Sequence, residues 1–406
     1  NFFYLIETEA SLEGDTLDKV KSLLSCGYRH ECHDGFFVTP RFGTISPWSS
    51  KATDIFHKIR SLHDLGVEIT LHVFLYKGKM PAPELEALTR KTHYYYRRSW
   101  VNPFWGTSPF VVNTRNSQAL LVNLLKDNDP ILFEGLHTTA YLQHPEIEKR
   151  VTVVRAHNVE HNYYRALGFA ERRWIKRKFF FLEAQRLQQY EPILNKATAI
   201  AGISPMETHY FQTTYGHSHY IPAFHSNTDV ASLTGKGDYV LYHGNLSIPE
   251  NDNAAIYLAS KVFPLLSQSC IIAGSNPSQM LQKAVAKYDH IQIKANLTAE
   301  EIFALVRNAH VNALVTFQST GIKLKLLNAL YRGRHIVANT PMIEETGLES
   351  LCQISDDPKS MADQIKNCFL NPFTEEDIEH RTQILGATFN NKNNAEKLLQ
   401  LLQKTK

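Results

Sequence analysis

The stretch LVTFQSTGIKLKLLNALYRG, residues 314–333, constrains the fold of this chain more than any other. Its apolar run Leu314–Phe317 predicts a buried strand, and after a polar turn the spacing of apolar residues predicts a helix that ends at Gly333. A strand that feeds a helix through a short turn presents free N–H groups, which together with the helix dipole suit a phosphate. The alternative is an ordinary buried strand–helix unit in which Lys323 and Lys325 are solvated.

Length and composition exclude several classes of protein. A chain of 406 residues favours two domains over one. Its formal net charge of +3 is too small to indicate a nucleic-acid partner. The five cysteines are scattered without zinc-like spacing, so a reducing, cytoplasmic environment is the simplest expectation. No apolar run approaches the ~18 residues of a membrane span, and no signal peptide is recognisable.

Short β-rich runs alternate with segments of helical period through most of the chain, which predicts an α/β protein with parallel sheets. Ligands of such sheets bind at the carboxyl ends of the strands. The strands expected from these runs are Val67–Leu75, Lys91–Arg97, Pro130–Glu134, Val151–Val154, Thr198–Ile203, Asp238–His243, Cys270–Ala273, Ile291–Ala295 and His335–Asn339. The main helices expected are Ile55–Leu65, Glu84–Arg90, Ser117–Lys126, Trp174–Asn195, Asn251–Val262, Ser278–Lys287 and Thr298–Arg307.

Polar residues follow three expected strands in the first half of the chain. They are Glu134 with the residues to His137, then His157, Asn158, Glu160 and His161, and finally Ser204. A histidine directly after a buried strand can act as a general base or bind a hydroxyl. The alternative is that His157 satisfies backbone groups of a loop. His157 and His161 are four residues apart, but no third ligand is evident and we predict no metal site.

Glycines follow three expected strands in the second half, at Gly244, Gly274 and Thr320-Gly321. Phosphates and nucleosides bind at such strand ends in α/β domains. Tight strand–helix turns need glycine in any case, so each glycine alone is weak evidence. Their repetition at successive strand ends favours a phosphate-binding domain.

The segment FVTPRFGTISPWSSKATDI, Phe37–Ile55, resembles the N-terminal region of phosphoribosylformylglycinamidine synthase, an amidotransferase of purine biosynthesis. The resemblance covers about the first 57 residues and ends near Ser50–His57. The catalytic parts of that family have no counterpart in this chain. A role in purine synthesis is therefore the least favoured interpretation.

Four further motifs resemble retaining glycosyltransferases of the GT-B fold, in the large group 1 or family 4-like class. They are VVRAHNVEHNYY at Val153–Tyr164, GISPMETHYF at Gly202–Phe211, YVLYHGNLSIPEN at Tyr239–Asn251 and TGIKLKLLNALYRG at Thr320–Gly333. The resemblance implies two Rossmann-like domains of doubly wound parallel sheets. We expect a purine-synthase-like segment at 1–57, an acceptor-side domain at 58–225, a donor domain at 226–389 and a closing helix at 390–406 that returns to the first domain.

The resemblance also implies roles for individual residues. His157 would lie near the transferred sugar and the acceptor, with Glu134, Asn158 and Glu160 on the acceptor side. Lys325 would act with His157 in catalysis by adding positive charge near the phosphates. The residues implied in donor binding are Ser204, Gly244, Asn245, Gly274, Thr320, Gly321, Ile322, Lys323 and Asn328. No metal or other cofactor is implied, because helix N-termini and basic side chains can stabilise a departing nucleoside diphosphate.

The chain departs from the family pattern in three places. The family usually has glutamate at both ends of an E-x7-E motif, where this chain has Thr320 and Asn328. No basic residue follows soon after Gly244. The first strand and glycine-rich loop are replaced by the purine-synthase-like segment, so the first sheet needs a strand from elsewhere. Phe2–Glu9 and Phe36–Val38 are the two candidates.

The sequence therefore predicts transfer of a hexose from a nucleotide diphosphate sugar to a glycan, lipid or small acceptor. The alternatives are a nucleotide-sugar-binding protein without turnover and a chimeric product that carries a purine-biosynthesis fragment. The basic aromatic segment Arg172–Phe181, RRWIKRKFFF, suits a peripheral contact with the inner face of a membrane. A buried helix with a solvated basic side is the alternative for this segment.

Overall fold

The computed structural model describes residues 48–75, 83–98, 102–171, 173–317, 324–344 and 346–404. The chain divides into two compact units, residues 1–42 and 43–406, and every described residue belongs to the second. The candidate strands Phe2–Glu9 and Phe36–Val38 and the site residues Thr320, Gly321, Ile322 and Lys323 lie outside the described residues. Among the described helices, none combines the length and apolarity needed to cross a bilayer.

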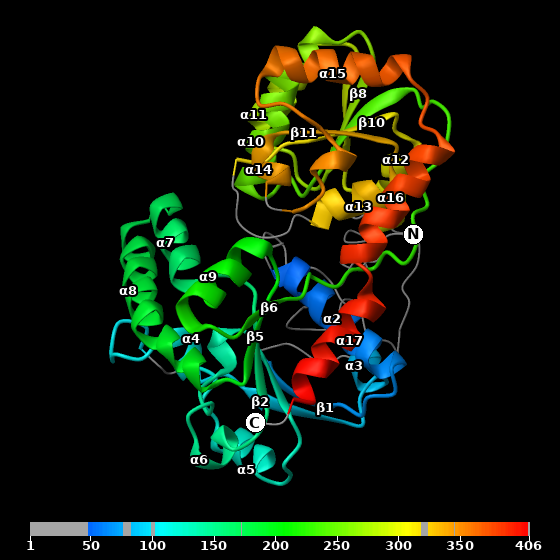
Figure 1. Cartoon of the computed structure of the whole chain (residues 1–406). Helices are drawn as coiled ribbons and strands as arrows, with labels where there is room; N and C mark the ends of the chain where they lie inside the picture. Colours follow the sequence, from blue (N-terminus) through cyan, green and yellow to red (C-terminus); the bar gives the residue numbers. More distant parts are fainter. Residues whose placement is uncertain are drawn as a thin grey trace, which may run out of the picture. The chain divides into compact units, whose positions relative to one another are not determined.

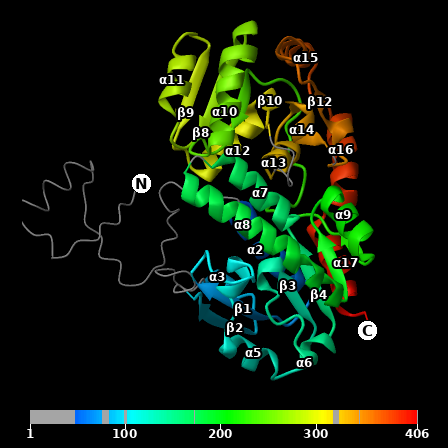
Figure 2. The same cartoon turned by 90° about the vertical axis from the view of Figure 1, so that its left-hand side faces the viewer.

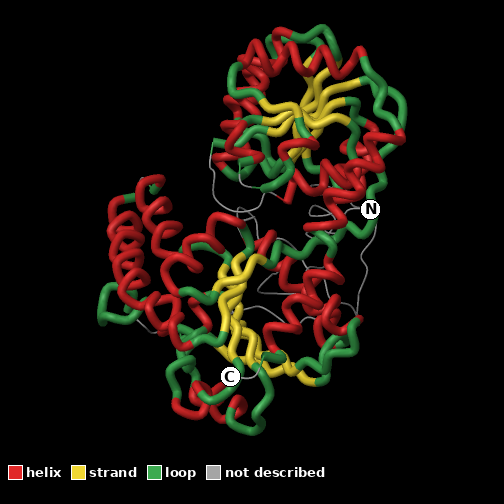
Figure 3. Tube along the Cα trace, in the orientation of Figure 1, coloured by secondary structure: helices red, strands yellow, loops and turns green. Residues whose placement is uncertain are grey.

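The described strands form three parallel sheets, shown in yellow in Figure 3. The two-stranded sheet consists of β1 (Thr70–Leu75) and β2 (Lys91–Tyr96). The four-stranded sheet runs in the order β3 (Ile131–Glu134), β4 (Thr152–Ala156), β5 (Ala199–Gly202) and β6 (Ser218–Tyr220). The six-stranded sheet runs in the order β12 (Gln353–Ile354), β11 (His335–Ala338), β10 (Val311–Leu314), β7 (Tyr239–His243), β8 (Ser269–Gly274) and β9 (Ile291–Ala295).

Within each sheet, helices separate successive strands, as the expected α/β pattern requires (Figure 1). The α-helices up to β6 are α2 (Trp48–Asp64), α3 (Pro83–Glu86), α4 (Phe110–Asn113), α5 (Gln118–Leu124), α6 (Pro145–Glu148), α7 (Glu160–Ala170), α8 (Trp174–Tyr190) and α9 (Pro205–Tyr215). Those after β6 are α10 (Pro249–Tyr257), α11 (Gln279–Val285), α12 (Ala299–Asn308), α13 (Leu324–Arg332), α14 (Thr340–Ile343), α15 (Pro358–Leu370), α16 (Glu375–Thr388) and α17 (Asn391–Leu402).

The six-stranded sheet is buried on both faces. Along β7, Val240 and Tyr242 pack into one core with α10, α11 and α15, whereas Leu241 packs into the opposite core with α12, α13 and α16. Because successive side chains of a strand point to opposite faces, a strand covered on both sides reads as a continuous apolar run. The apolar runs of the sequence therefore correspond to the strands of a doubly wound domain.

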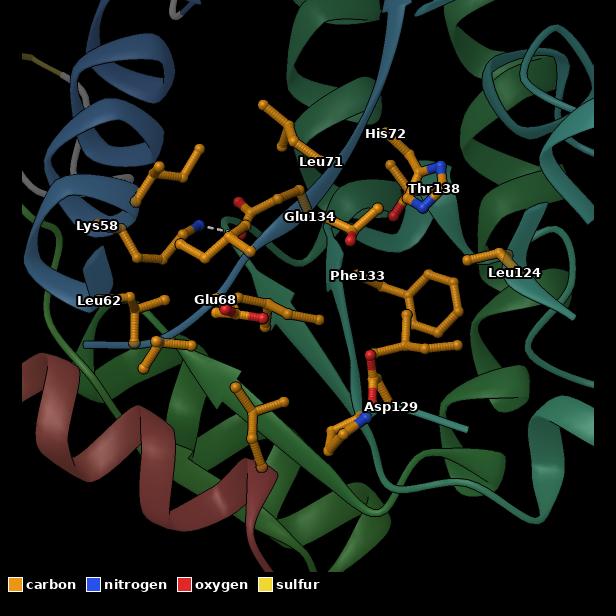
Figure 4. A pocket seen from close by; sticks show the side chains of 18 of the residues that line it. Lys58, Leu62, Glu68, Leu71, His72, Leu124, Asp129, Phe133, Glu134 and Thr138 are labelled. Carbon is orange, nitrogen blue, oxygen red and sulfur yellow. Dashed lines mark hydrogen bonds and ion pairs between the residues drawn. The ribbon is translucent and has the colours of Figure 1, made fainter. Parts of the chain in front are cut away.

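The first-half strands leave one position of such a sheet open. Among the described residues, β1 pairs only with β2, and β3 pairs only with β4. A doubly wound sheet has the strand order 3-2-1-4-5-6, in which the first strand of the chain lies between the second and the fourth. Here β1 takes the position of the second strand and β3 that of the fourth, so the position between them belongs to a strand that precedes β1. A cavity of about 270 Å³ lies at this place, between α2, β1 and β3 (Figure 4). The two strands expected as candidates for the first position, Phe2–Glu9 and Phe36–Val38, lie outside the described residues, so that expectation stays a prediction.

The C-terminal helix α17 packs against the four-stranded sheet. Its Ala395, Leu398 and Leu401 join one apolar core with Leu62 of α2 and Val153 of β4, and α17 and α2 lie side by side in Figure 1. Helix α17 therefore shares its apolar core with α2 and β4 of the first half of the chain.

The structure corrects the bounds of several expected elements. Helix α2 begins at Trp48 rather than Ile55, so that one continuous helix crosses the junction expected near Ser50–His57. The strand expected at Leu314–Phe317 is β10, Val311–Leu314. Its polar Asn312 is fully buried, and the side-chain Nδ2 donates to the carbonyl of Val306 at 3.2 Å. A buried polar side chain inside the strand explains why the apolar run alone misplaced it, although within the described residues the Oδ1 of Asn312 has no hydrogen-bond partner.

Candidate functional site

A cluster of charged residues lies where β3 and β4 end. Glu134 and Arg155 are neighbours in the parallel register of these strands, and His157 follows β4 directly. Helix α2 contributes Asp54 and Lys58, which are four residues apart and therefore lie on one face of the helix. The predicted residues Glu134 and His157 are thus brought together by the strands and covered by α2.

The ion pair between Asp54 and Arg155 is buried on both sides. Arg155 Nη2 donates to Asp54 Oδ1 at 2.9 Å, and the two side chains are 0% and 3% exposed. Arg155 also donates to the carbonyls of Ile221 and Pro222, and the N–H of Phe224 donates to Asp54 Oδ1 at 2.7 Å. Burial alone would raise the pKa of Asp54, but Arg155 and Lys58 hold that pKa below its usual value. Both charges are therefore compensated within the core.

Glu134 connects α2 to His157. The Lys58 ammonium donates to Glu134 Oε1, and His157 Nε2 lies 3.1 Å from Glu134 Oε2 (Figure 4 shows the Lys58–Glu134 pair). Lys58 is 2% exposed and His157 3% exposed, whereas the Glu134 side chain retains 23% exposure. Glu134 and Lys58 both line the cavity between β1 and β3. A ligand in that cavity would meet a neutralised carboxylate at its polar end.

The two histidines of the expected cluster have separate partners. His161 Nδ1 lies 3.0 Å from Glu191 Oε2, away from the carboxylate that pairs with His157. Ligand atoms of Asp54, Glu134 and His157 do lie within 4.8 Å of one another, which is close enough to consider a metal ion. Both carboxylates already pair with Lys58 or Arg155, and these cations oppose the binding of another. The donor set therefore suits an ion-pair network better than a metal centre.

The other predicted residues of this half occupy the turns after β4 and β5. Ser204 caps α9, and its hydroxyl accepts from the N–H of Glu207 at 3.2 Å. Asn158 lies in the bend between β4 and α7, and Glu160 is the first residue of α7. Glu160 is buried, and together with desolvation its charge raises the pKa of Tyr163 to about 12. Ser204 thus has a structural bond in addition to its predicted role.

The glycines of the six-stranded sheet lie against one another. Gly244 and Asn245 follow β7, and Gly274 ends β8, the neighbouring strand. A Cβ atom on Gly274 would overlap the carbonyl oxygen of Gly244 and come within 2.8 Å of Leu246. A close approach of two backbones needs glycine at this position. The structure therefore brings together two of the predicted donor-binding positions.

Lys325 of α13 is connected to the same turn through Asn251. Its Nζ donates to Asn251 Oδ1 at 3.0 Å, and Asn251 Nδ2 donates to the carbonyl of Asn245 at 3.1 Å. The Nδ2 of Asn245 is itself buried, and no partner for it occurs among the described residues. A positive charge, a glycine turn and a spare amide donor thus gather at the carboxyl ends of β7 and β10.

His243 is the last residue of β7 and faces the same charge. Burial and then the nearby Lys325 lower its pKa to about 4, so this imidazole is neutral at pH 7. The side chain is 6% exposed, and within the described structure its Nδ1 has no hydrogen-bond partner. A buried, neutral imidazole nitrogen without a partner is available to a ligand that offers a donor or acceptor.

Asn328, the residue at the second position of the altered glutamate motif, lies on α13 with Lys325. Its Oδ1 accepts from Asn227 Nδ2 at 2.9 Å, and Asn227 Oδ1 in turn accepts from Arg332 Nε at 2.9 Å. The amide therefore anchors α13 to the segment that follows β6. Its predicted bond to a ribose stays a prediction.

Sequence reasoning missed five residues of these two clusters: Asp54, Lys58, Arg155, His243 and Asn251. A signal existed for Arg155 and His243, because a charged or titratable residue inside an apolar strand demands a buried partner. Asp54 lies before the helix that was expected to begin at Ile55, so its i, i+4 pairing with Lys58 on α2 was not recognised. Asn251 looked like the first residue of a helix, and only the fold brings it to Lys325.

Comparisons with known proteins agree with this geometry. Residues 237–371 match the family model described as "Glycosyl transferases group 1", and residues 1–88 match "Formylglycinamide ribonucleotide amidotransferase N-terminal". A curated relative, an uncharacterized 44.6 kDa protein in the cps region of Klebsiella pneumoniae, is 25% identical over 313 residues, which are 72% of this chain and 80% of that protein. Asp54 and Lys58 lie inside the range of the amidotransferase match.

Solved structures share the fold at low sequence identity. A sucrose-phosphate synthase from Thermosynechococcus elongatus has a TM-score of 0.59 at 16% identity, over 85% of this chain and 90% of its own. HepE of Anabaena, solved with UDP and glucose, has a TM-score of 0.59 at 12% identity, over 89% of this chain and 97% of its own. A glycosyltransferase from Rickettsia africae has a TM-score of 0.57 at 12% identity, over 87% and 94%. Residues 237–371 are therefore similar to group 1 glycosyltransferases, and the described residues share the fold of solved GT-B glycosyltransferases.

Proposed function

We propose that the protein transfers a hexose from a nucleotide diphosphate sugar to a hydroxyl group of a glycan, lipid or small acceptor. The observation that carries the proposal is the link from Lys325 through Asn251 to the turn at Gly244 and Asn245. It gathers a cation, a close-packed glycine turn and a buried amide at one edge of the six-stranded sheet. These groups match the needs of a diphosphate and a ribose.

In the proposed reaction the bond between the sugar anomeric carbon and the diphosphate oxygen breaks, and a bond to the acceptor oxygen forms. The departing diphosphate gains negative charge, which the Lys325 ammonium would stabilise more strongly in the transition state than in the ground state. The acceptor proton leaves with the diphosphate or passes to solvent. His157 would hold a hydroxyl of the sugar or acceptor. No metal is assigned to these steps.

Two relatives support a nucleotide-sugar donor by their names alone. HepE was solved with UDP and glucose, and the sucrose-phosphate synthase is named for a sugar-transfer product. We carry over the class of donor and not its base or sugar. Binding without turnover is the second candidate, because Asn328 replaces a glutamate of the family motif.

The test combines calorimetric titration of UDP, GDP and ADP with an assay of donor hydrolysis and transfer. We expect one diphosphate to bind and Lys325→Ala to weaken it about 10-fold or more, while the exposed Lys359→Ala of the same domain does not. If wild type binds a diphosphate but shows no turnover, and Asn328→Glu gains no turnover either, the result would favour a binding protein without turnover. Equal affinity of Lys325→Ala and wild type would refute the site.

We also propose a peripheral contact with an anionic membrane through α7 and α8, which run side by side (Figures 1 and 2). The exposed fractions are 70% for Phe169 at the end of α7, and 66% and 52% for Trp174 and Ile175 at the start of α8. The alternative of a buried helix therefore does not apply to the first turn of α8. Exposed basic side chains flank them at Arg173 and 176–178. Apolar side chains beside a basic cluster favour the interface of anionic bilayers.

Vesicle sedimentation tests the membrane contact. We expect the protein to pellet with vesicles that contain phosphatidylglycerol and to stay in solution with pure phosphatidylcholine. Trp174→Ser combined with Ile175→Ser should abolish pelleting, whereas Met280→Ser, at a distant exposed apolar residue, should not. Equal pelleting of the double variant and wild type would contradict this surface.

A further inference from the structure

We propose that Glu134 and Lys58 are positioning residues that fix the tautomer and the charge state of His157. This inference rests on the proposed function, in which His157 binds a hydroxyl. It assigns an active role to Lys58 on α2, a helix that falls within the amidotransferase match and that the glycosyltransferase motifs do not include.

The first step concerns the protonation of Glu134. Burial alone would raise the pKa of this carboxyl, but Lys58, the hydrogen bond to His157 and the nearby Arg155 hold the pKa well below its usual range. An ionised carboxylate can only accept hydrogen bonds. The atom that faces Glu134 Oε2 at 3.1 Å, His157 Nε2, must therefore carry the proton. In the neutral imidazole this leaves the lone pair on Nδ1.

The second step concerns the charge of His157. A carboxylate beside a buried histidine stabilises the imidazolium form, which cannot accept a hydrogen bond. The Lys58 ammonium binds the other oxygen of the same carboxylate and offsets its charge. The charged groups that face His157 are Glu134 from β3, Asp54 and Lys58 from α2, and Arg155 from β4. Two anions and two cations therefore balance one another around the imidazole.

The third step concerns rigidity. Lys58 and His157 are almost fully buried, and Asp54 on the same face of α2 pairs with Arg155 two residues before His157. Helix α2 is thus attached to the ends of β3 and β4 at two points. A network whose members are all paired holds one geometry, as a positioning role requires.

Glu134→Gln tests the tautomer. The glutamine amide can donate to Nε2, which would move the imidazole proton to Nδ1, while Glu134→Asp keeps the accepting charge. With 15N-histidine labelling, we expect the His157 resonances to report Nε2–H in wild type and Nδ1–H in Glu134→Gln. We further expect the turnover number to fall about 100-fold in Glu134→Gln with the donor KM nearly unchanged, and to recover partly in Glu134→Asp.

Lys58→Met tests the charge balance. Without the ammonium, the acidic limb of the pH–rate profile should move up by about one pH unit, so that activity returns at alkaline pH. Lys58→Arg should keep the wild-type profile. The surface pair Lys149 and Glu146 provides matched controls, Lys149→Met and Glu146→Gln, which should change nothing. A uniform loss of activity at all pH values would mark Lys58 as merely structural and overturn the inference.

The labelling result stands apart from activity. Nδ1–H in wild type, or the same tautomer in wild type and Glu134→Gln, would overturn the proposal even in an active enzyme. If the expected tautomers are found but no donor turns over in wild type, then the proposed function fails and the positioning network remains.

Discussion

The buried ion pair between Asp54 and Arg155 gives the sharpest prediction about how α2 belongs to the glycosyltransferase fold. Asp54 accepts from Arg155 Nη2 at 2.9 Å, from Arg155 Nε at 3.3 Å and from the Phe224 N–H at 2.7 Å. Asp54→Asn would keep the shape and remove the charge. It would leave the Arg155 guanidinium fully buried, with the carbonyls of Ile221 and Pro222 as acceptors but without a counter-ion.

The magnitude follows from the burial of both groups. Removing one partner of a buried ion pair costs about 3–5 kcal/mol, because the remaining charge is left uncompensated. Glu134 lies near Arg155 and offsets part of that charge, so we expect the lower end, about 3 kcal/mol. For amide exchange in α2, an opening free energy reduced by this amount corresponds to exchange that is about 100-fold faster.

Hydrogen exchange followed by mass spectrometry measures this directly on peptides that cover α2. A local measurement is preferable because a chain of this size need not unfold in one step. The matched control is Asp64→Asn on the same helix, where the side chain is 66% exposed and the expected change is within about 0.5 kcal/mol. If the amides of α2 exchange no faster in the Asp54→Asn variant than in the Asp64→Asn variant, then this ion pair does not hold α2 and the reasoning is wrong.

Two further predictions concern the six-stranded sheet. Because the pKa of His243 is about 4 in the folded chain and about 6.5 when unfolded, stability should be fully present above pH 6.5 and decline as the pH falls towards 4, by up to about 3 kcal/mol. His243→Asn should make the melting temperature depend less on pH between pH 4 and 6.5. A pH dependence equal to that of wild type would contradict this. Gly274→Val should lower the melting temperature and abolish diphosphate binding, because its side chain would overlap the Gly244 carbonyl. Gly386→Ala, where a Cβ meets no atom within 4 Å, should be neutral or stabilising, and equal effects of the two would refute the close approach.

Much of the fold follows from apolar periodicity. Strand Ile291–Ala295 and the capped helix α12 were predicted within a residue of their observed bounds, and the capping box of Thr298 and Glu301 is present. The apolar periodicity of these elements shows which face is buried, and residues at their ends mark where they begin and end. The local sequence is therefore enough to predict them. The expected helix Glu84–Arg90 shortens to the single turn α3, because no side chain of that turn is buried to sustain it.

Elements stabilised by tertiary contacts were predicted less well. The short edge strand β6 was not predicted, and neither were α7 and α15. In the expected helix Trp174–Asn195, Trp174 is exposed, whereas Arg186 is only 4% exposed and its Nη1 donates to the carbonyl of Pro103. Glu183, three residues earlier on the same helix, lies 3.8 Å from this Nη1, but the carbonyl of Pro103 comes from a distant segment that no local pattern encodes.

The candidate site shows the same division. Strand ends placed His157 beside Glu134 and Gly244 beside Gly274, because parallel strands end at one edge. The partners that give these residues their chemistry come from elements far away in sequence, such as Lys58 for Glu134. Distance along the chain hides such pairs until the fold is known.

The central claim is that a nucleoside diphosphate binds at the turn after β7, facing α13. The most direct measurement is hydrogen exchange of the whole chain with and without the diphosphate that binds tightest. We predict that amides of Tyr239–Asn251 and Leu324–Arg332 exchange more slowly when it is bound, and that Lys325→Ala loses this protection. Protection confined to the four-stranded sheet, or binding that leaves both segments unchanged, would contradict the account.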